Sequence, residues 1–505
     1  MIEVDVDVAV MVALDRSSGA PLHRQLYEGL REGILAGRFP AGARLPSTRV
    51  LAAELEVSRN TVTSAFTQLL AEGYLEGRVG SGTYVAGALP DEMLRARRGS
   101  RGAGPLHEEE SVTSGGRRLS RRGELLAGTR TVTVRDRGRP RAFRPCVPAL
   151  EEFPGREWRQ ISARRWRRPP GGLLGYGDPA GYRPLREAIA GYLGAARAVR
   201  CSADRVVVVS GSQQALDLAA RVLLDPGDAV WVEDPGYAGA RAALVGAGAR
   251  LVPVPVDGDG LDVSAGTQRE AGARLAYVTP SHQYPLGPTM GLGRRLELLR
   301  WASRAGAWIV EDDYDGEYRY SGRPIEALQG LDDEGRVIYV GTFSKVLFPA
   351  LRLGYLVVPP DLVEAFVAAR ELSDRHSPVI DQAVLADFIL EGHFARHVRR
   401  MRTLYAARQE ALVEASRREL DGLIDVRPAE AGMHLVGFLP HGSGDREASR
   451  KAAAYGVEAP PVSAYALKDA PYHEPPHRPG LLLGYAALTE AEILRGARRL
   501  AAALG

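Results

Sequence analysis

Apolar residues stand at helical spacing near the start of the chain. Leucine or isoleucine recurs every four residues from Leu22 to Ile34, which places an apolar stripe along one face of a predicted helix. Ser47 and Ser58 stand where they can cap two shorter helices, because their hydroxyls can accept the first free backbone N–H groups. Glu56-Val57 connects these two helices tightly. The pattern therefore predicts a helix-turn-helix.

The residues that follow alternate apolar and polar positions, as β-strands do. Gly73–Glu76 and Thr83–Val85 flank the turn Gly80-Ser81-Gly82. Two short alternating runs around such a turn predict a β-hairpin. A hairpin directly after a helix-turn-helix is a wing, so we expect residues 15–86 to form a winged helix-turn-helix DNA-binding domain.

A change of composition separates this region from the rest of the chain. Residues 87–118 are rich in arginine, glycine and acidic residues with little apolar periodicity, which predicts a flexible basic linker. Residues 91–144 hold fourteen arginines and seven acids, a local excess of seven positive charges. This excess suits either a solvated tether or a weak contact with DNA phosphates, and the sequence leaves both open.

Residues 119–505 show a different pattern, in which short β-branched runs alternate with helix-length segments. Runs of this kind argue for a mostly parallel sheet covered by helices on both faces, an α/β fold. We expect a smaller C-terminal subdomain from about residue 390. The expected strands are Val206–Val209, Ala229–Val232, Leu275–Val278, Trp308–Val310 and Val337–Val340.

Composition narrows the class of protein. The chain has 505 residues, enough for two or three domains, and 45% hydrophobic with 25% charged residues is ordinary for a globular protein. The net charge of +3 does not by itself indicate nucleic acid. Cys146 and Cys201 lack a C-x-x-C spacing, so neither a disulfide framework nor a metal site is expected. No run approaches the ~18 apolar residues of a membrane span, so we expect a cytoplasmic protein without membrane insertion.

Placement, rather than net charge, points to the DNA contacts. The third helix opens at Ser58, and the first turn of a recognition helix meets base edges and phosphates. Arg59 can make a bidentate hydrogen bond to a guanine, whereas Thr61 and Thr63 can contact a phosphate or a thymine methyl group. Residues at the start of the second helix would position the domain on the backbone, and the wing glycines allow a close approach. The full candidate set is Arg44, Ser47, Thr48, Arg49, Ser58, Arg59, Asn60, Thr61, Thr63, Arg78, Gly80 and Gly82.

Residue types that can bind a cofactor are spread over the second half of the chain. Lys345 follows a predicted strand, Asp312 and Tyr314 follow another, and Ser212 with Gln213 opens a helix directly after a third. An amine, an acid, a stacking aromatic and phosphate donors are the groups that a pyridoxal 5'-phosphate site needs. Lys345 would hold the aldehyde, Asp312 would keep the ring nitrogen protonated, and Tyr314 would bond the ring's phenolate oxygen. The remaining candidate ligands are Ser212, Gln213, Tyr237 as the stacking ring, His282 or its neighbour Gln283, Thr342, Ser344 and Arg352.

The two halves each resemble a known family. The runs Arg44–Arg49, Val57–Val62 and Gly80–Val85 resemble the winged helix of the GntR regulators, over about residues 20–86. Thr342–Lys345 and Glu311–Tyr314, with the other motifs in this order, resemble fold type I, the aspartate aminotransferase fold, over about residues 119–505. The combination is similar to the MocR/GabR-type transcription regulators.

This resemblance implies roles that the residues alone do not settle. It makes Lys345 the internal aldimine lysine, Asp312 and Tyr314 the ring partners, and Ser344 with Arg352 phosphate ligands. It also implies a homodimer with swapped domains that binds paired sites in promoter DNA at the bacterial nucleoid. One departure stands out: aminotransferases of this fold place a carboxylate-binding arginine where residues 479–485 offer leucines. Arg478 is the nearest basic residue there, and Arg241 or Arg319 is the candidate replacement.

Three functions remain open at this point. The leading hypothesis is a transcription factor that senses pyridoxal phosphate itself, or an amine or amino acid that reacts at Lys345. The alternative is an active aminotransferase that carries a DNA-binding module. A third possibility is a DNA-binding protein whose large domain serves to dimerise.

Overall fold

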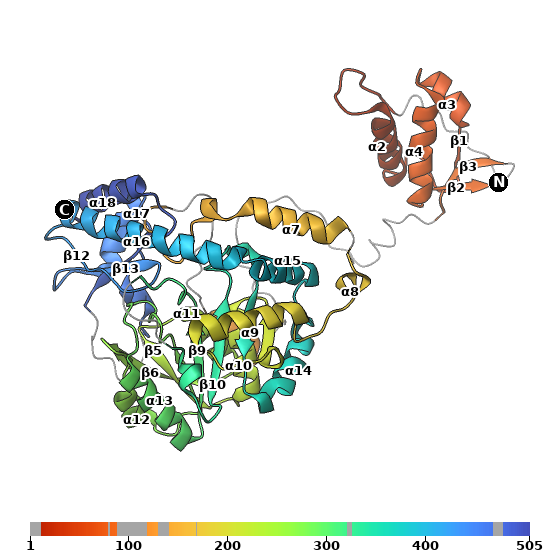
Figure 1. Cartoon of the computed structure of the whole chain (residues 1–505). Coiled ribbons are helices and arrows are strands. Elements are labelled where there is room, and N and C mark those ends of the chain that lie inside the picture. Colours follow the sequence, from red (N-terminus) through yellow and green to blue (C-terminus); the bar gives the residue numbers. More distant parts are fainter. Residues whose placement is uncertain are drawn as a thin grey trace. The chain divides into compact units, whose positions relative to one another are not determined.

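The chain divides into two compact units, residues 1–115 and 116–505. The computed structural model describes residues 12–78, 81–87, 119–129, 141–167, 169–320, 326–467 and 478–505. Gly80 and, apart from Gly87, the predicted linker lie outside these ranges. Figure 1 shows the elements of both units, and each unit is described separately.

The described residues of unit 1 form three helices and a small antiparallel sheet, as the sequence predicts. Its sheet has the strand order β1-β3-β2, and β2 and β3 form the hairpin. The side chains of Ser47 and Ser58 accept from the backbone N–H groups of Val50 and Thr61, so both predicted caps are confirmed. Its elements are α2 (Leu22–Leu35), β1 (Arg44–Leu45), α3 (Thr48–Glu54), α4 (Arg59–Ala71), β2 (Leu75–Arg78) and β3 (Gly82–Val85).

The core of unit 1 forms where the apolar stripe of α2 meets α4 and the hairpin. Leu26 and Leu30 are fully buried, and they share this core with Val62 and Phe66 of α4. Gly33 is required inside α2 because a Cβ there would lie 2.1 Å from the Phe39 ring. The Phe39 ring therefore packs directly against the backbone of α2.

Unit 2 is built on an eight-stranded sheet with the order β4-β11-β10-β9-β8-β5-β6-β7. The central pairs from β10 through β9, β8 and β5 to β6 are parallel, whereas β11 runs antiparallel to both neighbours. All five predicted strands are present, three of them longer than predicted. The strands are β4 (Val206–Val209), β5 (Ala229–Asp234), β6 (Arg250–Asp257), β7 (Gly260–Leu261), β8 (Leu275–Val278), β9 (Trp308–Asp313), β10 (Val337–Thr342) and β11 (Gly354–Val357).

Helices cover both faces of this sheet because successive side chains of a strand point to opposite sides. In β4, Val207 and Val209 pack with one set of helices, whereas Val206 and Val208 pack with the other. Trp231 of β5 stacks on Trp301 at 3.8 Å. One face carries α10 (Ser212–Leu223), α11 (Ala238–Gly246) and α14 (Val363–Asp374), and the other carries α9 (Arg183–Arg197), α12 (Val263–Glu270), α13 (Leu292–Ala305) and α15 (Val379–Leu390).

A second, three-stranded antiparallel sheet lies in the C-terminal part of unit 2, with the order β12-β13-β14. It has its own apolar core, and the long helix α16 lies alongside α18 (Figure 1). Its elements are α16 (His393–Glu419), β12 (Asp425–Val426), β13 (His434–Phe438), α17 (Asp445–Ala454), β14 (Gly480–Gly484) and α18 (Glu490–Leu504). The described residues before the large sheet also form α6 (Arg121–Gly128), α7 (Gly155–Arg167) and α8 (Gly171–Leu174).

Candidate functional site

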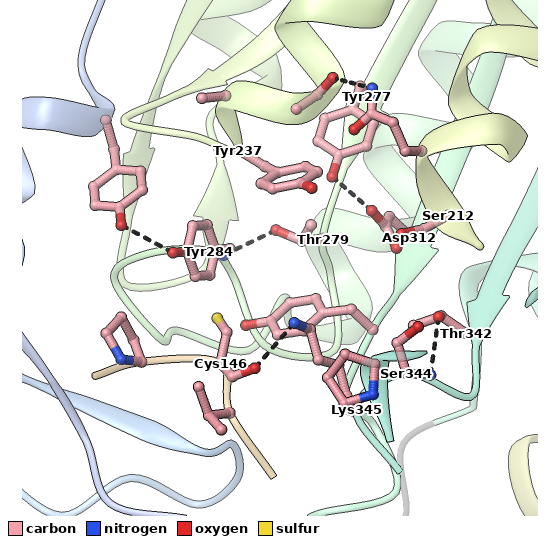
Figure 2. A pocket seen from close by; sticks show the side chains of 18 of the residues that line it. Cys146, Ser212, Tyr237, Tyr277, Thr279, Tyr284, Asp312, Thr342, Ser344 and Lys345 are labelled. Carbon is pink, nitrogen blue, oxygen red and sulfur yellow. Dashed lines mark hydrogen bonds between the residues drawn. The ribbon is translucent and has the colours of Figure 1, made fainter. Parts of the chain in front are cut away.

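A cavity of about 470 Å³ opens at the carboxyl ends of β9 and β10 in unit 2. Ligand crevices of open α/β sheets form at this edge because the strands deliver loop side chains there. Figure 2 shows the side chains that line it. Nine of the ten predicted cofactor ligands line this cavity: Ser212, Gln213, Tyr237, Asp312, Tyr314, Thr342, Ser344, Lys345 and Arg352.

Asp312 presents a buried carboxylate to the cavity. Its Oδ2 accepts a hydrogen bond from the Tyr277 hydroxyl at 2.8 Å, whereas Oδ1 is buried and has no hydrogen-bond partner within the described residues. Burial raises the pKa of Asp312 from 3.8 to about 7, against the opposing bond from Tyr277. A buried carboxylate oxygen without a donor is a ready acceptor for a protonated ring nitrogen.

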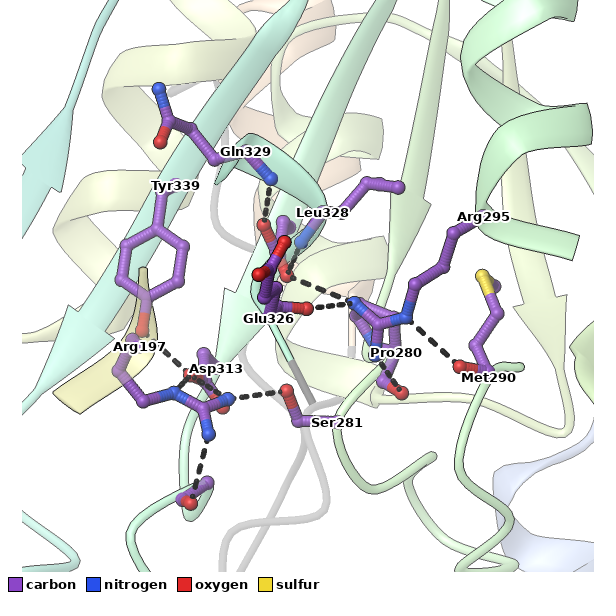
Figure 3. Close-up of polar contacts among 12 residues, drawn as sticks. Arg197, Pro280, Ser281, Met290, Arg295, Asp313, Glu326, Leu328, Gln329 and Tyr339 are labelled. Atoms are coloured by element: carbon purple, nitrogen blue, oxygen red, sulfur yellow. Dashed lines mark hydrogen bonds and ion pairs between the residues drawn. The ribbon is translucent and has the colours of Figure 1, made fainter. Parts of the chain in front are cut away.

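Strand alternation explains why Asp312, and not its neighbours, faces the cavity. Glu311 and Asp313 point to the opposite side of β9, where each pairs with a buried arginine. Figure 3 shows Asp313 with Arg197. Arg197 Nη2 lies 2.6 Å from Asp313 Oδ2, and Arg295 Nη1 lies 3.7 Å from Glu311 Oε1. These two ion pairs hold Glu311 and Asp313 on that side of β9. Asp312, which lies between them in the sequence, therefore faces the cavity.

One side of the cavity combines a helix N-terminus with a cation. The helix α10 begins at Ser212, directly after Gly211, whose φ is 92°. A Cβ at Gly211 would lie 2.9 Å from Arg352 Nη2, and that nitrogen donates to the Ser210 carbonyl at 2.8 Å. Ser344 Oγ is buried and, in the described chain, has no partner. An anion such as phosphate suits this combination of a helix N-terminus, a guanidinium and an unpartnered hydroxyl.

Lys345 enters the cavity from the loop after β10. Its Nζ donates to the Cys146 carbonyl oxygen at 3.0 Å (Figure 2). Cys146 has a φ of 62°, and burial raises the pKa of its thiol. The segment around Cys146 therefore covers the amine at short range, and no sequence motif indicated this.

Tyrosines form the rest of the wall. The Tyr237 ring meets Tyr284 edge-on at 5.9 Å, and burial raises the pKa of Tyr237 to about 12. The hydroxyls of Tyr284 and Tyr465 lie 3.1 Å apart. Tyr277, Tyr284 and Tyr465 line the cavity although the sequence patterns did not predict them. Tyr277 carries a hydroxyl in a buried strand, which is a usable signal, whereas Tyr465 comes from a distant part of the chain and gives none.

His282 and Gln283, one of which the sequence predicts to contact the cofactor, do not line the cavity, and that contact stays a prediction. His282 Nδ1 instead lies 2.9 Å from the Tyr314 hydroxyl and 3.0 Å from Asp315 Oδ2. Gln283 Nε2 donates to Glu233 and to the Pro235 carbonyl. Tyr284 of the same turn lines the cavity, whereas His282 and Gln283 lie one layer behind the cavity wall.

The predicted replacements for the carboxylate-binding arginine, Arg241 and Arg319, do not line the cavity either. Arg241 donates to the carbonyls of Gly236 and Tyr465, and Arg319 pairs with Glu430. Arg478 contacts Asp425 at 3.1 Å. A missed arginine, Arg144, does line the cavity, and its Nε is bonded to Glu458 at 2.8 Å.

In unit 1, the candidate DNA contacts gather at the starts of α3 and α4 and on the hairpin. Arg49 and Arg59 are exposed, as a phosphate or base contact requires. Ser58 Oγ also lies 2.8 Å from Thr61 Oγ1, and the Thr63 hydroxyl donates to the Arg59 carbonyl, so these hydroxyls already serve the helix. Arg78 pairs with Glu76 at 2.7 Å and lies over the Tyr84 ring, which holds it at the base of the wing.

Two negative findings bound the site. Across the parts of the chain that the structure describes, no helix is long and apolar enough to cross a membrane. Within the same residues, no group of three or more His, Cys, Asp or Glu side chains is arranged to hold a metal ion.

Comparisons with known proteins match each unit to a different family. Residues 22–85 match the gntR family of bacterial regulatory proteins, and residues 154–500 match the class I and II aminotransferases. The probable rhizopine catabolism regulatory protein MocR of Rhizobium meliloti is 45% identical over 98% of this chain and 96% of its own length. The pyridoxine biosynthesis transcriptional regulator PdxR of Corynebacterium glutamicum is 31% identical over 84% of this chain and 85% of its own.

A solved structure agrees with the fold of unit 2. The α-aminoadipate aminotransferase LysN of Thermus thermophilus, in complex with N-(5'-phosphopyridoxyl)-L-leucine, is 32% identical. The TM-score is 0.65, with 72% of this chain and 91% of that chain covered.

Proposed function

Because the chain belongs to the MocR-type helix-turn-helix regulators with an aminotransferase-like domain, we propose that it is a regulator whose DNA binding responds to pyridoxal 5'-phosphate chemistry at Lys345. One observation carries the proposal. Lys345 and two buried polar atoms without partners in the described chain, Asp312 Oδ1 and Ser344 Oγ, belong to residues that line one cavity.

The residues present fit this cofactor group by group. Pyridoxal phosphate, when bound, supplies an aldehyde carbon and an electron-withdrawing ring. Lys345 would bind the aldehyde, Asp312 would hold the proton on the ring nitrogen, and the Tyr314 hydroxyl would donate to the phenolate oxygen. Tyr237 would cover a ring face. The phosphate would lie against Ser212 at the start of α10, Thr342, Ser344 and Arg352.

The effector is pyridoxal phosphate itself or an amine that condenses with it, and the cavity favours a ligand without a carboxylate. A carboxylate in an enclosed site needs a cation. Among the described lining residues the cations are Lys345, Arg352 and Arg144, and Arg144 is bound to Glu458. The relative named for pyridoxine biosynthesis is consistent with pyridoxal phosphate, the vitamer, as the signal.

The functional unit is proposed to be a cytoplasmic homodimer with swapped domains that binds promoter DNA at two sites. Exposed apolar side chains support a second copy, because Leu174, Tyr176 and Leu372 are 62%, 84% and 87% exposed. A dimer of winged helices would also match paired DNA half-sites. Sedimentation of the full chain tests this part, and a monomer at micromolar concentration would contradict it.

Borohydride trapping tests the cofactor site directly. Lys345 is one of three lysines in the chain, with Lys451 and Lys468, so peptide mass spectrometry can assign the modified residue without ambiguity. We expect the phosphopyridoxyl group on Lys345 and a visible absorption band that Lys345→Ala abolishes. Lys451→Ala, an exposed change on α17, is the matched control. Promoter binding with and without the vitamer, in both variants, then tests whether occupancy changes DNA affinity.

An active aminotransferase remains the second candidate, because the lysine, the acid and the tyrosine of the reaction are all present in the cavity. Steady-state assays with an amino donor and a keto acceptor separate the two functions. Many turnovers at ordinary enzyme rates would identify an enzyme, whereas at most one conversion per protein chain supports the regulator.

A further inference from the structure

His282 lies one layer behind the cavity, between a wall residue and a buried acid. Its side chain is 1% exposed, and Nδ1 is 2.9 Å from the Tyr314 hydroxyl oxygen and 3.0 Å from Asp315 Oδ2. Tyr314 lines the cavity, whereas His282 and Asp315 do not. His282 Nε2 and Asp315 Oδ1 are buried without partners in the described chain, so the interactions of this pair converge on Nδ1.

The tautomer of His282 decides in which direction the Tyr314 hydroxyl can donate a hydrogen bond. Nδ1 carries either a proton or a lone pair, so it cannot donate to Asp315 and accept from Tyr314 at once. A buried carboxylate needs a donor, which selects the tautomer with the proton on Nδ1. In that tautomer the N–H also faces a lone pair of the Tyr314 oxygen. The hydroxyl proton of Tyr314 is then directed away from His282, toward the cavity.

Packing holds the His282 ring in this orientation. Gly432 packs against one side of the His282 ring, since a Cβ there would lie 2.1 Å from His282 Cε1. The His434 ring lies 5.0 Å away, and its Nε2 bonds the Pro285 carbonyl at 3.0 Å. The preceding residue, Ser281, accepts from Arg197 at 2.7 Å, the same arginine that fixes Asp313 (Figure 3). Burial raises the pKa of Tyr314 well above its usual range, so its hydroxyl keeps its proton.

We propose that His282, oriented by Asp315, is a positioning residue that holds the Tyr314 hydroxyl as a hydrogen-bond donor toward the cavity. The inference rests on the proposed function, because an anionic oxygen such as the ring phenolate of pyridoxal phosphate is the acceptor that such a donor would serve. His282 does not touch the vitamer and acts through Tyr314.

Two isosteric substitutions separate the two ring nitrogens. The amide nitrogen of asparagine reaches the place of Nδ1, whereas that of glutamine reaches the place of Nε2. In the full-length protein, His282→Asn should bind pyridoxal phosphate within about threefold of the wild type. His282→Gln should bind about tenfold more weakly, the effect of one hydrogen bond to a charged group. It should also move the pH midpoint of the visible band, because the phenolate oxygen loses its donor.

Tyr314→Phe distinguishes positioning from packing. Adding His282→Gln to Tyr314→Phe should cause no further loss of vitamer affinity, because the hydroxyl that His282 orients is absent. A similar loss with asparagine and glutamine that persists in the Tyr314→Phe background would overturn the inference in favour of a packing role. Wild-type behaviour of His282→Gln in both readouts would also overturn it. Absence of vitamer binding by the wild type would instead refute the proposed function.

Discussion

The two units place their functional side chains in opposite environments. The starts of α3 and α4 present exposed arginines, Arg49 and Arg59, to water. The cavity of unit 2 instead surrounds buried groups such as Asp312 and Ser344, each with a buried oxygen that has no partner among the described residues. Exposed charges interact weakly and nearly independently, whereas buried polar groups are strongly coupled to their neighbours. Substitutions in the cavity should therefore have larger and less additive effects than those on the DNA-binding face.

The largest effect is expected for Asp312→Asn. The change removes the charge that would hold the proton on the ring nitrogen, and breaking a buried charge pair costs about 3–5 kcal/mol. We expect the affinity for pyridoxal phosphate to fall by about 100-fold or more, as measured by absorbance titration. Asp421→Asn, an exposed change, is the control and should bind normally. Wild-type affinity of Asp312→Asn for pyridoxal phosphate would show that the Asp312 carboxylate does not hold the cofactor ring.

The same substitution should stabilise the vitamer-free protein at high pH. The pKa of Asp312 is raised to about 7, so between about pH 4 and 7 the folded chain keeps a proton that the unfolded chain has lost. The stability contributed by this proton is full below about pH 4 and is lost as the pH rises through 7. Asparagine stays neutral at every pH. The Tm difference between variant and wild type should therefore be near zero at about pH 4 and positive at about pH 8.

Gly33→Ala tests whether a loss of stability in unit 1 leaves vitamer binding in unit 2 unchanged. Its Cβ would lie 2.1 Å from the buried Phe39 ring, and overpacking of this kind costs about 1–3 kcal/mol. We expect the unfolding transition of unit 1 to move to lower temperature and DNA binding to weaken, while vitamer affinity is unchanged. Gly19→Ala, whose Cβ meets no atom of the described residues within 4 Å, is the matched control. A parallel loss of vitamer binding would show that the units are energetically coupled.

The sequence predicted most of the fold because both units follow strong local patterns. Serine caps and the four-residue spacing of α2 predicted unit 1, and the β-branched runs predicted the strands of the large sheet. The pattern also placed Asp312 at a strand end, and strand alternation explains why Asp313 is not its equivalent. The covering segment at Cys146 and the wall residue Tyr465 could not be predicted, since tertiary packing brings them in from far along the chain.

His282 shows a second limit of the sequence. A histidine in a polar turn beside a cofactor motif can contact the ligand or support a residue that does, and no spacing distinguishes the two. In the structure His282 contacts Tyr314, which lines the cavity, and does not line it itself; this arrangement favours the supporting role.

On the DNA-binding face, Arg59→Ala and Arg49→Ala should differ in kind. Loss of a forked contact with guanine costs about 1–3 kcal/mol of discrimination, so Arg59→Ala should lose preference for the operator over random DNA. Arg49→Ala should weaken binding to the operator and to random DNA alike. It should also lower, by about 1, the slope of log affinity against log salt concentration. Titrations at several salt concentrations measure both quantities. Equal losses on all sequences for both variants would contradict the assigned roles.

The smallest effect is expected at Ser58, where two roles can be separated. Its Oγ accepts from the Thr61 backbone N–H at 3.1 Å, and loss of such a cap in Ser58→Ala costs about 1 kcal/mol. Ser58→Asp keeps the cap and adds a negative charge that suits a helix N-terminus, so the stability of unit 1 should be retained. If α4 begins against DNA phosphates, that same charge should weaken binding to every DNA sequence, most strongly at low salt. Stable Ser58→Asp protein with undiminished DNA affinity would place the start of α4 away from the phosphate backbone.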